Sequence, residues 1–312
     1  MAVYVNTNVS SLNGRRHLNN VQNQLSTTYQ RLSSGMRINS AKDDAAGLQI
    51  ADRLTTQING LNQGNRNTND GIALAQTIES GMDEMSGMLQ KIRTLAVQAA
   101  NGTNTAEDRA SIKKEGDALK DEITRIAKQT KFGGKTVLNG FQKDTSIYQS
   151  ANNPGANGQA GAAPNANSTG TLVLQIGANK GDEIAFKVEN FAFCYIASRG
   201  DNATLKAWDD KKGLTLSTAS GAKNVIALMD NMIAQVDSQR SDLGAIQNRL
   251  ESSIRNQSNV AANQADARSR IRDADFAEES AALSQQSIIQ QAATSMLMQA
   301  NSRPQLALSM LG

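Results

Sequence analysis

A heptad-like seam about 50 residues long constrains the fold of this chain more than any other feature of its sequence. Positions from Val225 to Ala274 that step alternately by four and three are apolar at eleven of fifteen places, and no proline interrupts them. At 1.5 Å per residue, a helix of this length measures roughly 75 Å. A helix cannot bury one narrow apolar stripe against itself, so the seam requires partner helices elsewhere in the chain.

Two further segments carry apolar residues at the same spacing and are predicted to be those partners. Residues 48–100 contain one uninterrupted run: Ala75, Ile78, Met82, Met85, Leu89, Ile92, Ala96 and Ala99. Residues 105–129 begin with a Thr-x-x-Asp pattern at Thr105 and Asp108, which is typical of a helix start. Because the connection between them is short, we expect these two helices to be antiparallel.

Weaker helical patterns flank this bundle at the two ends of the chain, at 3–33 and 276–310. Their polar faces consist mainly of Asn, Gln, Ser and Thr, which are indifferent helix formers. Isolated segments of this kind should be helical only when their apolar stripes are covered. We expect the stripes to cover each other and then neighbouring copies of the chain. Their predicted packing residues are Leu18, Val21, Leu25, Leu32, Ala282, Ile289, Ala293 and Met296.

Residues 141–222 differ in composition and are predicted to form a small β-rich insert. A Gly-, Asn- and Pro-rich stretch occupies 150–170, and short strands are expected near 172–176, 183–188 and 214–216. Most aromatic residues of the chain lie here, so we expect the insert to have a modest core of its own. The predicted fold class is therefore mainly α: a long antiparallel coiled-coil bundle of paired N- and C-terminal segments, with a small β-rich central insert.

The composition narrows the functional classes. A net charge of +3 without a Lys/Arg block gives little basis for binding nucleic acid. No apolar run is long enough to span a membrane, and the first residues do not resemble a secretory signal peptide. Cys194 is the single cysteine, which excludes an internal disulfide framework.

The motifs that resemble catalytic or cofactor sites each lack residues that such sites require. We therefore expect no cofactor, no metal and no enzymatic activity. Gly134-Lys135-Thr136 resembles the end of a phosphate-binding loop, but Gln129 stands where that loop needs glycine. A calcium-loop-like run at 65–76 has Asp70 where glycine is required. His17 is the only histidine, so one subunit has no His-based triad and no two-histidine metal site.

Three stretches resemble bacterial flagellin, the subunit of the flagellar filament. They read LSSGMRINSAKDDAAGLQIA at 32–51, QKIRTLAVQAAN at 90–101 and RDADFAEES at 272–280, followed by the helix from 289 to 301 and a leucine-rich end. The resemblance covers about 230 residues at the two flanks. It implies a structural subunit that polymerises into the filament for swimming motility, with terminal helices that become ordered on assembly.

The same resemblance implies a division into domains and a set of partners. A terminal helical domain, 1–44 with 272–312, would form an inner tube, and 45–140 with 223–271 would form an α-helical spoke domain. The variable outer insert would occupy 141–222. Implied partners are other copies of the chain, an export chaperone on the C-terminal helix, the flagellar type III export apparatus, and the filament cap and junction proteins. The protein would be extracellular and exported without a cleaved signal peptide.

The resemblance also implies a possible host partner, because many flagellins are sensed by an innate Toll-like receptor through the spoke-domain helices. The matching positions here are Lys91, Leu95, Gln98 and Glu115, with Lys91 in place of the usual Arg and Thr94 in place of the usual Glu. A lysine cannot reproduce a bidentate arginine contact.

Ser168, Thr169 and Thr171 lie in an expected loop and are candidate glycosylation sites.

Two other functions compete with a filament subunit. A hook–filament junction protein would share similar ends, but full-length spoke and C-terminal motifs favour a flagellin. An enzyme within the insert is the third class, and the small insert shows no HExxH or other metal-ligand set.

Overall fold

The computed structural model describes residues 7–140, 145–150, 170–198, 208–209 and 213–309. These residues form six α-helices and seven short strands, which confirms the predicted mainly α class. The chain divides into two compact units, one formed by 1–59 with 260–312 and the other by 60–259. Helices α2 (Ala45–Ala100) and α5 (Ala219–Arg272) contribute residues to both.

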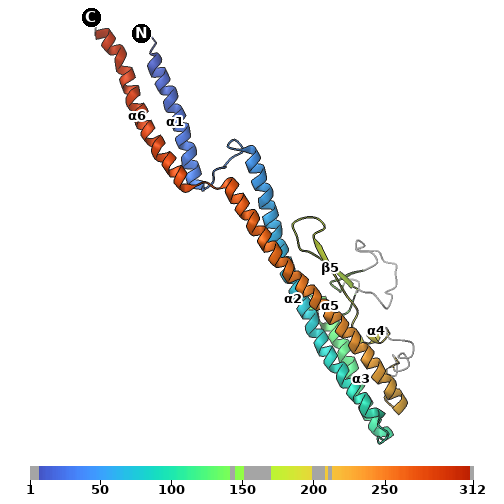
Figure 1. Ribbon diagram of the computed structural model, residues 1–312. Helices are drawn as coiled ribbons and strands as arrows, with labels where there is room; N and C mark the ends of the chain where they lie inside the picture. The colour runs from blue at the N-terminus through green and yellow to red at the C-terminus, as the bar shows by residue number, and fades with distance from the viewer. Residues whose placement is uncertain (1–6, 141–144, 151–169, 199–207, 210–212, 310–312) are drawn as a thin grey trace. The chain divides into compact units, whose positions relative to one another are not determined.

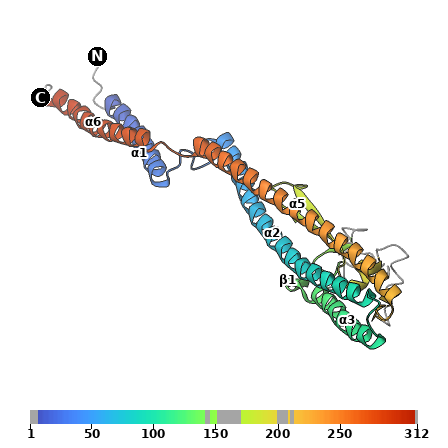
Figure 2. The same ribbon diagram turned by 60° about the horizontal axis from the view of Figure 1, so that its bottom comes forward.

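In the unit formed by 60–259, α2 and α5 lie side by side and antiparallel (Figures 1 and 2). Their register is marked by Arg93 Nε, which donates to Asp230 Oδ1 at 2.5 Å, and by Gln247 Nε2, which donates to Glu79 Oε2 at 2.9 Å. The predicted seam is buried on α5 at these positions: Val225, Met229, Met232, Val236, Gln239, Leu243, Leu250 and Gln257. The four–three spacing therefore identified the buried face correctly.

Helix α3 (Ala106–Gln129) packs its own apolar stripe into the same core through Ile112, Gly116, Ile123 and Ala127. The predicted start signal is a complete capping box. Thr105 Oγ1 accepts from the Asp108 N–H, and the Asp108 side chain accepts from the Thr105 N–H. Two hydrogen bonds lower the pKa of Asp108: the one from the Thr105 hydroxyl has the larger effect, and the one from the Thr105 backbone N–H has the smaller. The box is therefore strongest above the ordinary carboxyl pKa and weakens as the pH falls through the lowered value.

The central strands are short and antiparallel. A hairpin joins β1 (Lys131–Phe132) to β2 (Lys135–Thr136), and Gly133 and Gly134 both have positive φ at its turn. The Gly134-Lys135-Thr136 sequence, which resembles the end of a phosphate-binding loop, therefore belongs to a tight β-hairpin. A three-stranded sheet has the order β3 (Gln149–Ser150), β4 (Gly170–Gln175), β5 (Glu183–Val188). A one-turn helix, α4 (Phe193–Ser198), and the pair β6 (Trp208–Asp209) and β7 (Gly213–Leu214) follow.

The insert does not have the separate core expected from its aromatic content. Phe186 and Val188 on β5, and Phe191 and Phe193 after it, belong to one buried cluster with residues of α2, α3 and α5. A sheet of so few residues cannot bury an apolar face alone, so it packs on the helices.

The close approach of the insert depends on glycines spaced along α2. A Cβ added at Gly60 would lie 2.7 Å from Ala178 Cβ, and one at Gly64 would lie only 1.9 Å from the Ile176 carbonyl oxygen. At Gly71 the nearest atom would be Leu174 Cδ1, at 2.4 Å. The backbone after β4 can therefore contact α2 only because these helical positions lack side chains.

Candidate assembly interface

In the unit formed by 1–59 and 260–312, α1 (Val9–Ser34) and α6 (Phe276–Ser309) lie side by side in antiparallel orientation. The face of α1 that contacts α6 includes the predicted packing residues Leu18, Val21, Leu25 and Leu32, all of which are half-buried. Thr28 is the one buried residue of α1, at 4% exposure. A single helix pair therefore covers the α1 stripe only in part.

Polar contacts fix the register of this pair. Asn8 Nδ2 donates to the Ala300 carbonyl oxygen at 2.8 Å, and Thr28 Oγ1 donates to Gln286 Oε1 at 3.1 Å. Near the other end of α1, Arg31 Nη1 forms an ion pair with Glu279 Oε1 at 3.2 Å, with both side chains mostly shielded from solvent. Polar contacts at both ends and an incomplete apolar stripe between them define one fixed alignment of the two helices.

The two chain segments that interrupt the helices also pair with each other. Helix α1 ends at Ser34, and its C-cap residue Gly35 adopts the left-handed conformation. The Gly35 carbonyl oxygen accepts from the Ala274 N–H at 3.0 Å. In return, the Arg37 N–H donates to the Arg272 carbonyl oxygen at 2.7 Å. Ile38 is buried beside this pairing, at 2% exposure. The segment between α1 and α2 is therefore ordered by backbone hydrogen bonds to the residues that join α5 to α6.

Asp43 and Asp44 accept backbone hydrogen bonds in the segment between α1 and α2 and at the start of α2. Backbone N–H groups of Ser40 and Asn39 donate to Asp43 Oδ2 at 2.9 and 3.1 Å, and they hold the pKa of that carboxyl below its ordinary value. Asp44 Oδ1 accepts from the Gly47 N–H at 2.9 Å, as an N-cap residue does. Asp44 thus satisfies a backbone donor that the first turn of α2 would otherwise leave unpaired, whereas Asp43 satisfies two donors of the segment before the helix.

Helices α1 and α6 expose many large apolar side chains. Of the eleven large hydrophobic side chains that are exposed among the described residues, eight lie on these two helices. They are Val9, Leu12, Tyr29, Phe276, Ile288, Ile289, Met296 and Met298, and we call them the outer apolar set. Isolated exposed apolar residues are common on proteins, whereas a concentration on two helices marks an interaction surface.

The predicted packing residues of α6 differ in their exposure. Ala282 and Ala293 are half-buried, while Ile289 and Met296 belong to the outer apolar set, at 42% and 67% exposure. The sequence reasoning treated all four as one stripe and missed Ile288 and Met298. The signal was present: Ile288 and Ile289 lie about 100° apart around the helix, so the apolar surface of α6 must be wider than one narrow stripe.

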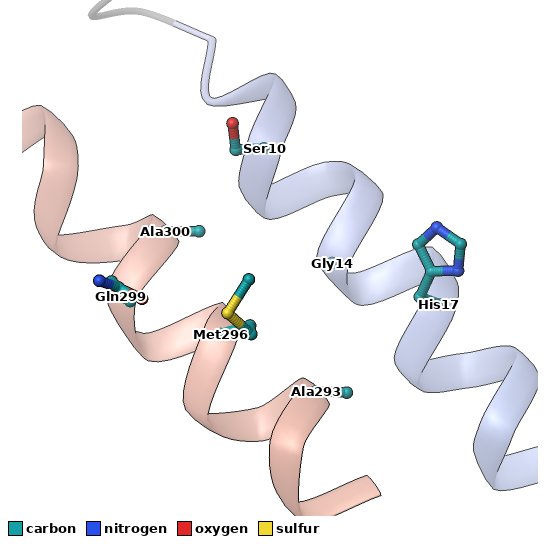
Figure 3. Close-up of a pocket in the computed structure, with 7 residues that line it drawn as sticks. All are labelled: Ser10, Gly14, His17, Ala293, Met296, Gln299 and Ala300. Atoms are coloured by element: carbon teal, nitrogen blue, oxygen red, sulfur yellow. The ribbon is translucent and has the colours of Figure 1, made fainter. Parts of the chain in front are cut away.

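A hollow of about 510 Å³ lies between residues 10–17 of α1 and residues 293–300 of α6 (Figure 3). Small residues form much of its lining: Ser10 and Gly14 from α1, and Ala293 and Ala300 from α6. Gly14 also permits close packing, because an added Cβ there would lie 3.0 Å from Leu297 Cδ1. Met296 lines the hollow from α6, and His17 lines it from α1. The hollow leaves apolar surface available to another chain.

The four receptor-matched residues lie on α2 and α3. Lys91 Nζ forms an ion pair with Glu115 Oε1 at 3.3 Å, so these two positions contact each other directly. Gln98 is exposed, whereas Leu95 is only 8% exposed and belongs to the core cluster. The structure thus brings Lys91 and Glu115 together and leaves little of Leu95 accessible in this conformation.

The remaining predicted sites fall partly outside the described residues. Ser168 and Thr169 lie outside them, and Thr171 is a half-buried residue of β4 opposite Lys187.

Within the described ranges, no group of three or more His, Cys, Asp or Glu residues is arranged to hold a metal ion. Among the same residues, no helix combines the length and the apolar content that crossing a membrane requires.

The fold and this surface define a class: a helical structural protein with an internally packed bundle and a pair of terminal helices whose outer apolar surface is uncovered. Comparison with known sequences identifies the family. The N-terminal helical region of bacterial flagellins matches residues 5–143, and the C-terminal helical region matches residues 226–311. The chain belongs to the bacterial flagellin family, and it is a structural subunit of the flagellar filament.

Individual relatives agree with this assignment over the full chain. Polar flagellin F of Vibrio parahaemolyticus and flagellin A of Vibrio cholerae are each 37% identical to it, with all of both chains covered. Among solved structures, one described as a flagellar hook-associated protein from Vibrio parahaemolyticus covers 74% of this chain and all of its own, with a TM-score of 0.55. At 18% identity, that likeness shows a shared fold only.

Proposed function

We propose that this chain assembles through the outer apolar set on α1 and α6, and that these helices acquire their full order in the filament. The observation that carries the proposal is the concentration of large exposed side chains on the two terminal helices. Transfer of apolar surface from water contributes roughly 25 cal/mol per Å². Contacts with neighbouring copies would supply the burial that one helix pair cannot provide.

The limited internal packing of α1 supports coupling between order and assembly. Its polar surface is rich in Asn and Gln, and only Thr28 is buried along its 26 residues. A helix with so little tertiary packing is marginal in water. Part of the free energy of association would therefore be used to order α1 and α6.

Contacts of this kind lead to an open polymer. The outer apolar set of one subunit would pack on different surfaces of the next, and such head-to-tail contacts form helical filaments when the rotation does not close a ring. Within this scheme, 1–44 with 272–312 form the inner tube, 45–140 with 223–271 form the spoke domain, and 141–222 form the outer insert. The breaks between α1 and α2 and between α5 and α6 support the first boundary.

Further partners follow from membership of the family. We propose export through a flagellar type III apparatus to an extracellular location, with a chaperone bound to α6 beforehand. A chaperone there would cover Ile288, Met296 and Met298, which are exposed in the single chain. Contacts with cap and junction proteins would use the same terminal helices.

Recognition by a Toll-like receptor would use the surface around Lys91, Gln98 and Glu115. The Lys91–Glu115 ion pair is exposed, so both groups are accessible to a partner that offers competing charges. Leu95 would contribute little without a local rearrangement, because it is 8% exposed. We therefore expect the polar residues to dominate any such contact.

The test of the assembly proposal is electron microscopy of material polymerised from the purified protein. We expect helical filaments to form from this chain alone once it is seeded or concentrated. Globular particles that remain monomeric at every concentration tested would contradict the proposal.

A further inference from the structure

The turn between α2 and α3 contains an Asn–Gly step in an unusual setting. The sequence has five such steps, at Asn13, Asn59, Asn101, Asn139 and Asn157, and all but the last lie among the described residues. Glycine has no Cβ, so its backbone nitrogen can approach the side-chain carbonyl carbon of a preceding asparagine. Such a step can therefore cyclise wherever its backbone is free to move.

Three of the four described steps are held in place. Asn13–Gly14 lies within α1 and Asn59–Gly60 within α2, where the helical ladder uses the glycine N–H. Asn139 pairs with Asn190 in a β-bridge, and Gly140 is buried. By contrast, Asn101 and Gly102 are exposed, and the Gly102 N–H donates no hydrogen bond within the described part of the chain.

Hydrogen bonds in the turn favour the reaction at Asn101. The Thr103 N–H points to Asn101 Oδ1 at 3.5 Å, which folds the asparagine side chain back toward the Asn101–Gly102 peptide, as in an Asx turn. An N–H contact to Oδ1 also polarises the side-chain carbonyl that would be attacked. The Asx turn thus keeps the side-chain carbonyl of Asn101 near the nitrogen of Gly102.

Arg109 acts on the peptide that would lose a proton. Its Nη2 donates to the Asn101 carbonyl oxygen at 2.9 Å, while its Nε donates to the Ala99 carbonyl oxygen at 2.9 Å and holds the guanidinium in place. When the Gly102 nitrogen loses its proton, resonance places the negative charge largely on the Asn101 carbonyl oxygen. A fixed cation at that oxygen stabilises the charge as it develops.

We propose that Asn101 is a site of spontaneous, self-promoted deamidation, with Arg109 as a positioning residue. The deprotonated Gly102 nitrogen attacks Asn101 Cγ, the new C–N bond closes a succinimide, and ammonia leaves with the proton. Water then opens the ring at either carbonyl and yields aspartate or isoaspartate. The formal net charge of +3 falls by one as a carboxylate appears beside Arg109, ahead of the α3 N-terminus.

The site can be tested by incubating the full-length protein at mildly alkaline pH and following the amide-to-acid mass change in tryptic peptides. Asn101 lies in the peptide that ends at Arg109, separate from those that contain Asn13 and Asn59. We expect Asn101 to convert at least about tenfold faster than Asn59 within α2, a difference of about 1.4 kcal/mol in barrier. Equal rates at Asn101 and Asn59 in the folded protein would overturn the proposal.

Two variants separate the roles of the backbone and the guanidinium. Gly102→Ala leaves room for its Cβ, since nothing lies within 4 Å of that position, and it should suppress conversion at Asn101 without unfolding the chain. Arg109→Gln should slow conversion severalfold while the urea-denatured chain reacts at the wild-type rate. Undiminished conversion in folded Arg109→Gln would refute the role of Arg109, and undiminished conversion in Gly102→Ala would refute the succinimide route.

Discussion

Ile289→Asp is expected to abolish filament formation while the isolated chain remains folded. Ile289 belongs to the outer apolar set and is 42% exposed, so an aspartate there stays hydrated in the monomer. In a filament the same carboxylate would be buried against a neighbouring chain without a partner, at a cost of several kcal/mol. The measurement is sedimentation of polymer from a seeded reaction, with circular dichroism to confirm the helical content of the monomer.

Val173→Asp is the matched control for that variant. Val173 is an apolar residue of β4 with 37% exposure, so the change in side chain and the degree of exposure are similar, but the position is far from α1 and α6 in the sequence. We expect normal polymer from this control. Normal polymer from Ile289→Asp as well would show that the outer apolar set does not form the contacts between subunits.

Leu25→Asp addresses the inner side of the same pair and should give a different pattern. Leu25 is half-buried between α1 and α6, so its replacement weakens the helix pair before any assembly takes place. We expect loss of polymer together with a lower helical content in the monomer. The bundle of α2, α3 and α5 should keep its stability, because Leu25 is not part of that core.

Gly64→Ala is expected to destabilise the folded chain by about 1–3 kcal/mol, the range typical of overpacking. A Cβ at this position would lie 1.9 Å from the Ile176 carbonyl oxygen, which is backbone and cannot rotate away. The segment after β4 would have to move off α2, which would disturb the Asn67 Nδ2 hydrogen bond to the Gln175 carbonyl oxygen at 2.9 Å. Urea denaturation measures the resulting change in the free energy of unfolding.

Gly87→Ala, on the same helix, is the control with the opposite expected sign. Gly87 is exposed, and nothing lies within 4 Å of a Cβ added there. Because alanine favours a helix interior by about 1 kcal/mol over glycine, this variant should be more stable than the parent. If Gly64→Ala also stabilised the chain, the backbone contact between α2 and the β4–β5 connection would not exist as described.

Much of the bundle could be predicted from the sequence because its signals are local and periodic. The four–three spacing from Val225 to Leu250 identified the buried face of α5, and Thr105 and Asp108 marked the start of α3. Both features depend on residues within one or two helical turns. Such patterns fix an element and its buried face without knowledge of the partner.

Features that depend on contacts between distant segments could not be predicted in the same way. Gly64 resembles a defect in a helix until the carbonyl oxygen of Ile176 is placed against it. Phe186 and Phe193 suggested a separate core because the sequence does not show which surface the insert packs on. For the assembly surface, the spacing placed Ile289 and Met296 on the same stripe as Ala293, although only Ala293 is half-buried in the single chain.

Amide hydrogen exchange, compared between dilute monomer and assembled polymer, tests most directly whether the terminal helices become ordered on assembly. We predict rapid exchange in the monomer along α1 and α6, with protection along the buried parts of α2, α3 and α5, and strong protection of α1 and α6 in the polymer. Equal protection of α1, α6 and the bundle in the dilute monomer, unchanged in the polymer, would contradict that claim.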